Sequence, residues 1–68
     1  MNEDNFNMEM RKFLKKVGIT SQRDITHAVE TAISEGKLTG KEVLSATVTL
    51  VIPDIGLNTE IKGDISLD

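Results

Sequence analysis

The sequence predicts a single α+β domain in which two amphipathic helices pack on a C-terminal antiparallel β-hairpin. Three observations predict this fold class. Apolar residues recur with the period of a helix over residues 3–17 and again over 21–35, and they alternate with polar residues from about residue 42 onward. The length of 68 residues allows one small domain. A chain of this size buries only about 60% of the surface that its unfolded form exposes, so nearly all of its apolar side chains are needed to form the core.

The first helix is expected over residues 3–17, with Asn2 or Asp4 as its N-cap. Its apolar positions repeat every three or four residues and form one stripe, made of Phe6, Met10, Phe13, Leu14 and Val17. The opposite side of the helical wheel carries Met8 and four basic residues, namely Arg11, Lys12, Lys15 and Lys16. Gly18 follows, and glycine is typical of the position at which a helix ends.

The second helix is expected over residues 21–35. Ser21 followed by Asp24 resembles an N-cap with an acidic residue in the first turn, and Gly36 stands just beyond the C-terminal end. The apolar stripe of this helix consists of Ile25, Ala28, Val29, Ala32 and Ile33. Because the intervening turn at residues 19–21 is short, the two helices are expected to be neighbours in space.

A β-hairpin is expected at the C-terminal end, with strands over about residues 42–52 and 57–67 and a loop at residues 53–56. This loop places Ile52 opposite Leu57 and puts the apolar row of the first strand (Leu44, Ala46, Val48, Leu50, Ile52) on the same side of the sheet as that of the second strand. A slip of one residue would turn the apolar set of the second strand into water, so the alternation fixes the register.

The expected core combines the helical stripes with one face of the hairpin. A two-stranded hairpin is marginally stable in water and two helices cover only one of its faces, so another element is expected to complete the sheet. Residues 37–41, around Leu38, are one candidate for a third strand. Pairing of sheet edges between two copies, which would make a homodimer, is the other. The predicted core consists of Phe6, Met10, Phe13, Leu14, Val17, Ile25, Val29, Ala32, Ile33, Val48, Leu50, Ile61 and Ile65.

Composition argues against several kinds of chemistry. The chain has no Cys, which excludes disulfides, a thiolate nucleophile and a Cys-type zinc site, and it has no Tyr or Trp to stack on bases. The only histidine, His27, falls on the exposed side of the second helix, and the five glycines are too dispersed for a phosphate loop. We therefore predict no catalytic, cofactor-binding or metal site and no enzyme activity. No signal or membrane segment is recognisable, so a cytoplasmic location is expected.

Charge is unevenly distributed between the two halves of the chain. Residues 1–41 carry seven basic and six acidic side chains, whereas residues 42–68 carry one basic and five acidic side chains. Such asymmetry can steer association with a partner. The function that we expect is a protein–protein interaction module with an unknown protein partner. Its possible contact residues are Met8, Arg11, Lys12, Lys15, Lys16, Gln22 and Arg23.

The alternative is a nucleic-acid-binding protein of the winged helix-turn-helix type. In that reading the basic residues of the first helix contact phosphates, residues 50–58 form the wing, and base edges are read by Ser21, Gln22, Arg23 and Thr26. Three observations disfavour it: the third helix of the fold is missing, Asp54 makes the wing acidic, and the net charge is -3.

Three segments carry a resemblance to a known family. They are the opening MNEDNFNMEMRKFLKKVGITSQRDI, the element Glu35-Gly36-Lys37-Leu38 and the closing Ile52-Pro53-Asp54-Ile55-Gly56-Leu57. Together they resemble a family of short, uncharacterised bacterial proteins, a domain of unknown function, over essentially the whole chain. The resemblance implies a free-standing bacterial protein and supplies no activity, cofactor or site residue.

Overall fold

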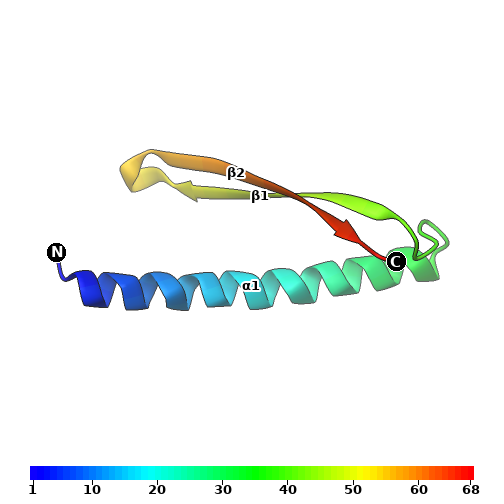
Figure 1. The fold of residues 1–68 in the computed structure, drawn as a ribbon, viewed down its shortest axis with the longest axis horizontal. Coiled ribbons are helices and arrows are strands. Elements are labelled where there is room, and N and C mark those ends of the chain that lie inside the picture. The colour runs from blue at the N-terminus through cyan, green and yellow to red at the C-terminus, as the bar shows by residue number, and fades with distance from the viewer. The chain divides into compact units, whose positions relative to one another are not determined.

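The computed structural model describes residues 1–68 and contains one long helix followed by a β-hairpin (Figure 1). Helix α1 covers Glu3–Ser34, strand β1 covers Val43–Ile52, the 3₁₀ turn η1 covers Pro53–Ile55, and strand β2 covers Leu57–Ser66. The chain divides into two compact units, Met1–Lys37 and Leu38–Asp68. The α+β class is confirmed, with a single helix in place of the two that were expected.

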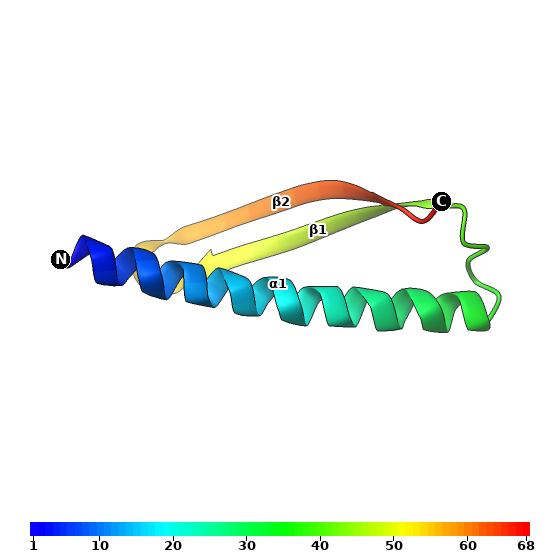
Figure 2. The same cartoon turned by 60° about the horizontal axis from the view of Figure 1, so that its bottom comes forward.

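Helix α1 continues through the segment where a turn was predicted, and Figure 2 shows it without a break. Gly18 does not adopt a positive φ, so it does not end a helix there. The two predicted stripes are in phase, because Val17, Ser21 and Ile25 are spaced by four residues and continue the same row. A glycine within a helix costs only about 1 kcal/mol relative to alanine, which does not by itself end a helix of this length.

We call this row the α1 stripe. Its nine positions lie within about 120° of the helix circumference, given 3.6 residues per turn. They are Phe6, Met10, Phe13, Leu14, Val17, Ser21, Ile25, Ala28 and Ala32, and the charged Asp24 lies within the same arc. Ser21 is therefore a half-buried member of the stripe in the middle of α1, and it is not an N-cap.

Both ends of α1 are capped by local hydrogen bonds. At the start, the Oδ1 atom of Asn2 accepts a hydrogen bond from the backbone N–H of Asn5 at 3.0 Å. Of the two N-caps that the sequence predicted, Asn2 and Asp4, Asn2 is therefore the one that the structure uses. At the end, Gly36 has a φ of 77° and donates to the carbonyl of Ile33, while Lys37 donates to that of Ala32. This pair of bonds is a Schellman motif, in which glycine is favoured because the left-handed conformation strains other residues.

The hairpin has the predicted register. Ile52 pairs with Leu57, Val48 with Ile61, and Ala46 with Gly63. The turn is built by η1 and by Gly56, whose φ of 65° is left-handed. The sheet has two strands only, so the third strand considered near Leu38 is not formed. On the apolar face several side chains are half-buried, namely Leu44, Ala46, Leu50, Leu57 and Ile65, whereas no residue of the opposite face is.

No side chain of the chain is buried, and the predicted core positions remain open to solvent. Phe13 is 52% exposed on α1 and Ile61 is 56% exposed on β2. The prediction that these residues form a buried core is wrong. The physical reason is that each unit is one layer thick, and a single layer cannot enclose a side chain on all sides.

Candidate functional site

All seven predicted contact residues lie on α1, on the side opposite the α1 stripe. Successive residues of a helix are about 100° apart, and this spacing brings the seven positions onto one half of the circumference. They are Met8, Arg11, Lys12, Lys15, Lys16, Gln22 and Arg23. We call this half the basic face. Because α1 is continuous, the basic face unites Gln22 and Arg23 with the residues that the sequence assigned to a separate helix.

The positive charges of the basic face are not neutralised within the chain. The ion pairs of the structure are Lys37 with Glu35 at 3.2 Å and Lys62 with Glu60 at 4.0 Å, and both are exposed. No arginine or lysine between residues 8 and 23 has a carboxylate oxygen within 4.0 Å of its side-chain nitrogens. The basic side chains of this face are therefore free to contact a partner.

The geometry of a winged helix-turn-helix is absent. That arrangement requires a turn before the recognition helix, so that residues at the N-terminal end of the second helix reach base edges. Here Ser21 and Thr26 are interior residues of α1. The predicted wing, residues 50–58, is the end of the hairpin with its turn η1. The helix-turn-helix prediction is therefore wrong, because the turn on which it depended is helical.

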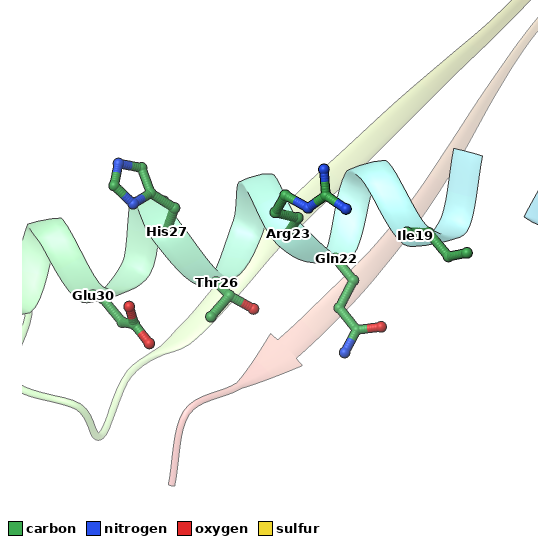
Figure 3. Close-up of a pocket in the computed structure, with 6 residues that line it drawn as sticks. All are labelled: Ile19, Gln22, Arg23, Thr26, His27 and Glu30. Carbon is green, nitrogen blue, oxygen red and sulfur yellow. The ribbon is translucent and has the colours of Figure 1, made fainter. Parts of the chain in front are cut away.

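A shallow depression lies on the surface of α1 around His27 (Figure 3). It is lined by Ile19, Gln22, Arg23, Thr26, His27 and Glu30, and all six residues come from the same helix. In Figure 3 the side chains of His27 and Arg23 extend from one edge of the helix, and those of Gln22 and Glu30 extend from the other. Small-molecule sites are concave and need more than one wall, which a single helix does not supply.

The loop before β1 contains a carboxylate site that the sequence reasoning missed. The Glu42 side chain accepts the backbone N–H groups of Thr39, Gly40 and Lys41 at distances of 2.8 to 3.1 Å. Hydrogen bonds from the backbone N–H groups of Thr39 first, and then of Glu42 itself and Gly40, lower the pKa of Glu42 from 4.5 to about 2. The signal in the sequence was Thr39 followed three residues later by Glu42, the spacing with which a Glu side chain reaches back to a backbone N–H.

Two further findings concern metals and membranes. No three His, Asp or Glu side chains come together in a group that could hold a metal ion. No helix has the combination of length and apolar character that crossing a membrane requires.

Comparison with known families gives one result. The sequence model of a family described as a family of unknown function, DUF6494, matches residues 1–68. The chain belongs to the DUF6494 family. The resemblance of the sequence to a family of unknown function is thereby confirmed over its whole length. No curated protein and no solved structure matches the chain.

Proposed function

We propose that this DUF6494 chain is a non-enzymatic protein–protein interaction module whose apolar faces are covered by a protein partner. The observation that carries the proposal is that no side chain is buried, while every large apolar side chain of the α1 stripe except Val17 is at least 40% exposed. Folded proteins gain most of their stability from burying such surface. A chain that leaves it open gains that stability on association.

The two units need such a contact for different reasons. An isolated helix in water is only marginally stable, because most helix stability in proteins comes from packing of the apolar face. Helix α1 also contains Gly18 and several β-branched residues, which lower its intrinsic helix propensity. A two-stranded hairpin is equally marginal when it stands alone. Both units therefore carry an apolar face whose burial is required for a stable fold.

Hydrogen exchange of the full-length chain over a wide range of concentrations tests this proposal. The expected result is weak protection of the α1 and β1 amides at nanomolar concentration and strong protection once a partner or a second copy is bound. Concentration-independent, cooperative protection of a monomer would overturn the proposal, because the chain would then bury its own apolar faces.

Nucleic-acid binding is the second candidate function. The observation that favours it is the row of unpaired basic side chains on the basic face, from Arg11 to Arg23. Contacts with the phosphate backbone require positively charged side chains, and they do not require a helix-turn-helix. It remains second because the net charge of the chain is -3 and because no aromatic side chain lies on that face.

A further inference from the structure

The outer edge of β1 carries a row of backbone groups without partners. The sheet has two strands, so β1 is paired on one side only. The N–H of Leu67 donates to the carbonyl of Glu42 at 2.9 Å, and these two residues continue the register of the hairpin by one pair. In an antiparallel ladder the N–H and C=O groups of successive residues point to alternate sides, so the even-numbered residues of β1 bond to β2. The odd-numbered residues turn these groups outward, and no other backbone bond reaches them: Val43, Ser45, Thr47, Thr49 and Val51.

We infer that the outer edge of β1 pairs with the same edge of a second copy, antiparallel and about a two-fold axis at Thr47. Such an axis stands perpendicular to the sheet and keeps each side chain on its own face, so one residue must lie opposite its own copy. With the axis at Thr47, Val43 lies opposite Val51 of the second copy and every outward N–H of β1 meets a carbonyl. Moving the axis by one residue toward either end would place Val43 or Val51 opposite a residue outside β1.

The side chains on the apolar face of the hairpin fit this register. Ala46 lies opposite Val48 of the second copy, and Leu44 lies opposite Leu50. Each of these pairs occurs twice because the arrangement is two-fold symmetric. Every pair on this face therefore joins two apolar side chains, and the apolar face of one hairpin continues into that of the other.

The opposite face of β1 fits the same register. Thr47 lies opposite Thr47, and Ser45 lies opposite Thr49 of the second copy. Cross-strand pairs of hydroxyl-bearing residues are favourable. The strand carries no charged residue, so the pairing neither removes a charge from water nor brings like charges together.

The outer edge of β2 does not fit a second copy in this way. Its outward residues are the even-numbered ones from Asn58 to Ser66, and the axis that would pair all of their N–H groups passes through Lys62. Lys62 would then lie opposite Lys62, and Glu60 opposite Asp64. Like charges directly opposite each other on neighbouring strands are destabilising. The same argument that supports pairing through β1 therefore opposes pairing through β2.

Pairing through β1 supplies what the hairpin lacks. A sheet of two strands is marginally stable in water, whereas three or more strands with an apolar face can be stable. The dimer contains a sheet of four strands, in which both copies of β1 are central and both copies of β2 are outer strands. This inference rests on the proposed function and names a second copy of the chain as the partner of the β1 edge.

Hydrogen exchange of single amides in the full-length chain tests the pairing with an internal control. In a monomer the N–H of Val48 is bonded to β2 and that of Thr47 is open, so protection alternates along β1. In the dimer both are bonded. Going from monomer to dimer, as defined by sedimentation equilibrium, is expected to slow the exchange of Thr47 at least about tenfold relative to that of Val48. A Thr47 amide that exchanges as fast in a dimer as in the monomer would overturn the inference.

Disulfide trapping tests the register, and the chain suits it because it contains no cysteine of its own. Full-length Ala46→Cys and Val48→Cys chains are mixed in a glutathione redox buffer. With the axis at Thr47 these two positions lie opposite each other, with Cα atoms about 4.5 Å apart, so a mixed disulfide is expected. Two copies of position 46 would be about 8 Å apart, which is beyond disulfide reach, and the same holds for position 48. Faster disulfide formation by either variant alone than by the mixture would overturn the axis at Thr47.

A charge at the axis supplies a second test. Thr47→Glu puts two carboxylates opposite each other in the dimer, and within the hairpin it lies opposite Lys62, so the hairpin itself is not opposed. Sedimentation equilibrium is expected to show a dimer weakened at least about tenfold. Asn58→Glu adds the same charge to the same face but on β2, and it is the matched control with no expected effect. Equal dissociation constants for the two variants would contradict pairing through β1.

The oligomeric state separates failure of this inference from failure of the proposed function. A chain that stays monomeric and weakly protected at every concentration, or that dimerises without the mixed disulfide, overturns pairing through β1. The proposed function then stands with a different partner or a different surface. A monomer that cooperatively protects its apolar faces overturns both, because the chain then covers those faces itself.

Discussion

The carboxylate of Glu42 accepts the backbone N–H of Thr39 at 2.8 Å, in the loop that leads into β1. The same carboxylate accepts the N–H groups of Gly40 and Lys41, and the backbone carbonyl of Glu42 accepts the N–H of Leu67 at 2.9 Å. One residue thus holds the loop through its side chain and the last part of the chain through its backbone. Loss of the negative charge of Glu42 would therefore weaken the bonds that hold this loop.

The first prediction is the pH at which this loop is released. Because the pKa of Glu42 is lowered from 4.5 to about 2, its bonds stabilise the loop fully above pH 4.5 and are lost as the pH falls through about 2. The amide shifts of Thr39 and Gly40, followed by NMR, are expected to titrate with a midpoint near 2. Glu42→Gln should abolish that transition. A midpoint near 4.5 would show that the carboxylate does not hold these amides.

The second prediction concerns Gly18. Since Gly18 is an interior residue of α1 without a positive φ, Gly18→Ala is expected to raise the helix content and to stabilise the chain by up to about 1 kcal/mol. Two helices separated by a left-handed Gly18 would give the opposite sign, because alanine is strained there. Circular dichroism at 222 nm together with urea unfolding measures both quantities.

The third prediction compares two glycines of the hairpin. A Cβ atom at Gly56 or at Gly63 would meet no atom within 4 Å, so the two positions differ only in backbone conformation and not in space. Gly56 has a left-handed φ of 65°, and Gly56→Ala is expected to destabilise the hairpin by about 1 kcal/mol. Gly63→Ala, in the middle of β2, should be neutral or slightly stabilising. Similar effects of the two substitutions on urea unfolding would argue against the left-handed turn.

The fourth prediction compares two equally exposed residues of α1, one on the α1 stripe and one on the basic face. Phe13 and Ile19 are 52% and 50% exposed, but Phe13 belongs to the stripe and Ile19 lies on the basic face. If exposure alone mattered, Phe13→Gln and Ile19→Gln would have the same small effect. Because we expect a partner to cover the stripe, Phe13→Gln should lower the melting temperature at micromolar concentration, whereas Ile19→Gln should leave it nearly unchanged. Melting followed by circular dichroism makes the comparison.

The fifth prediction concerns duplex DNA. If the chain is a protein-interaction module, labelled DNA should show no change in fluorescence anisotropy at physiological salt. Binding that weakens steeply with salt, and further in a Lys15→Glu, Lys16→Glu double variant, would make nucleic acid the first candidate, because phosphate contacts release counterions.

The hairpin could be predicted from the sequence because strand pairing depends on a strict alternation. With a period of two, a slip of one residue would put Val48 and Ile61 on opposite sides, and the turn residues 53–56 set the loop length and so select the register. The ends of α1 were also predictable, since Asn2 and Gly36 act through local hydrogen bonds that residue type and position indicate.

The continuity of α1 could not be predicted from residue preferences alone. Glycine and serine are common at helix ends, so Gly18 and Ser21 favoured a turn. The spacing of the apolar residues before and after them favoured a single helix. In the structure the two apolar rows form one continuous row on a single helix. The loop around Glu42 was missed for a related reason: its hydrogen bonds connect a side chain to the backbone and leave no periodic pattern.

The charges of the hairpin make its two edges unequal. Strand β2 carries Glu60, Lys62 and Asp64, whereas the ten residues of β1 carry no charge at all. Charged side chains discourage the addition of a further strand, and an uncharged edge permits it. Addition of a further strand is therefore less favourable at the β2 edge than at the β1 edge. If two β1 edges paired, the edges left open would be the charged β2 edges, which discourage growth into open-ended fibres.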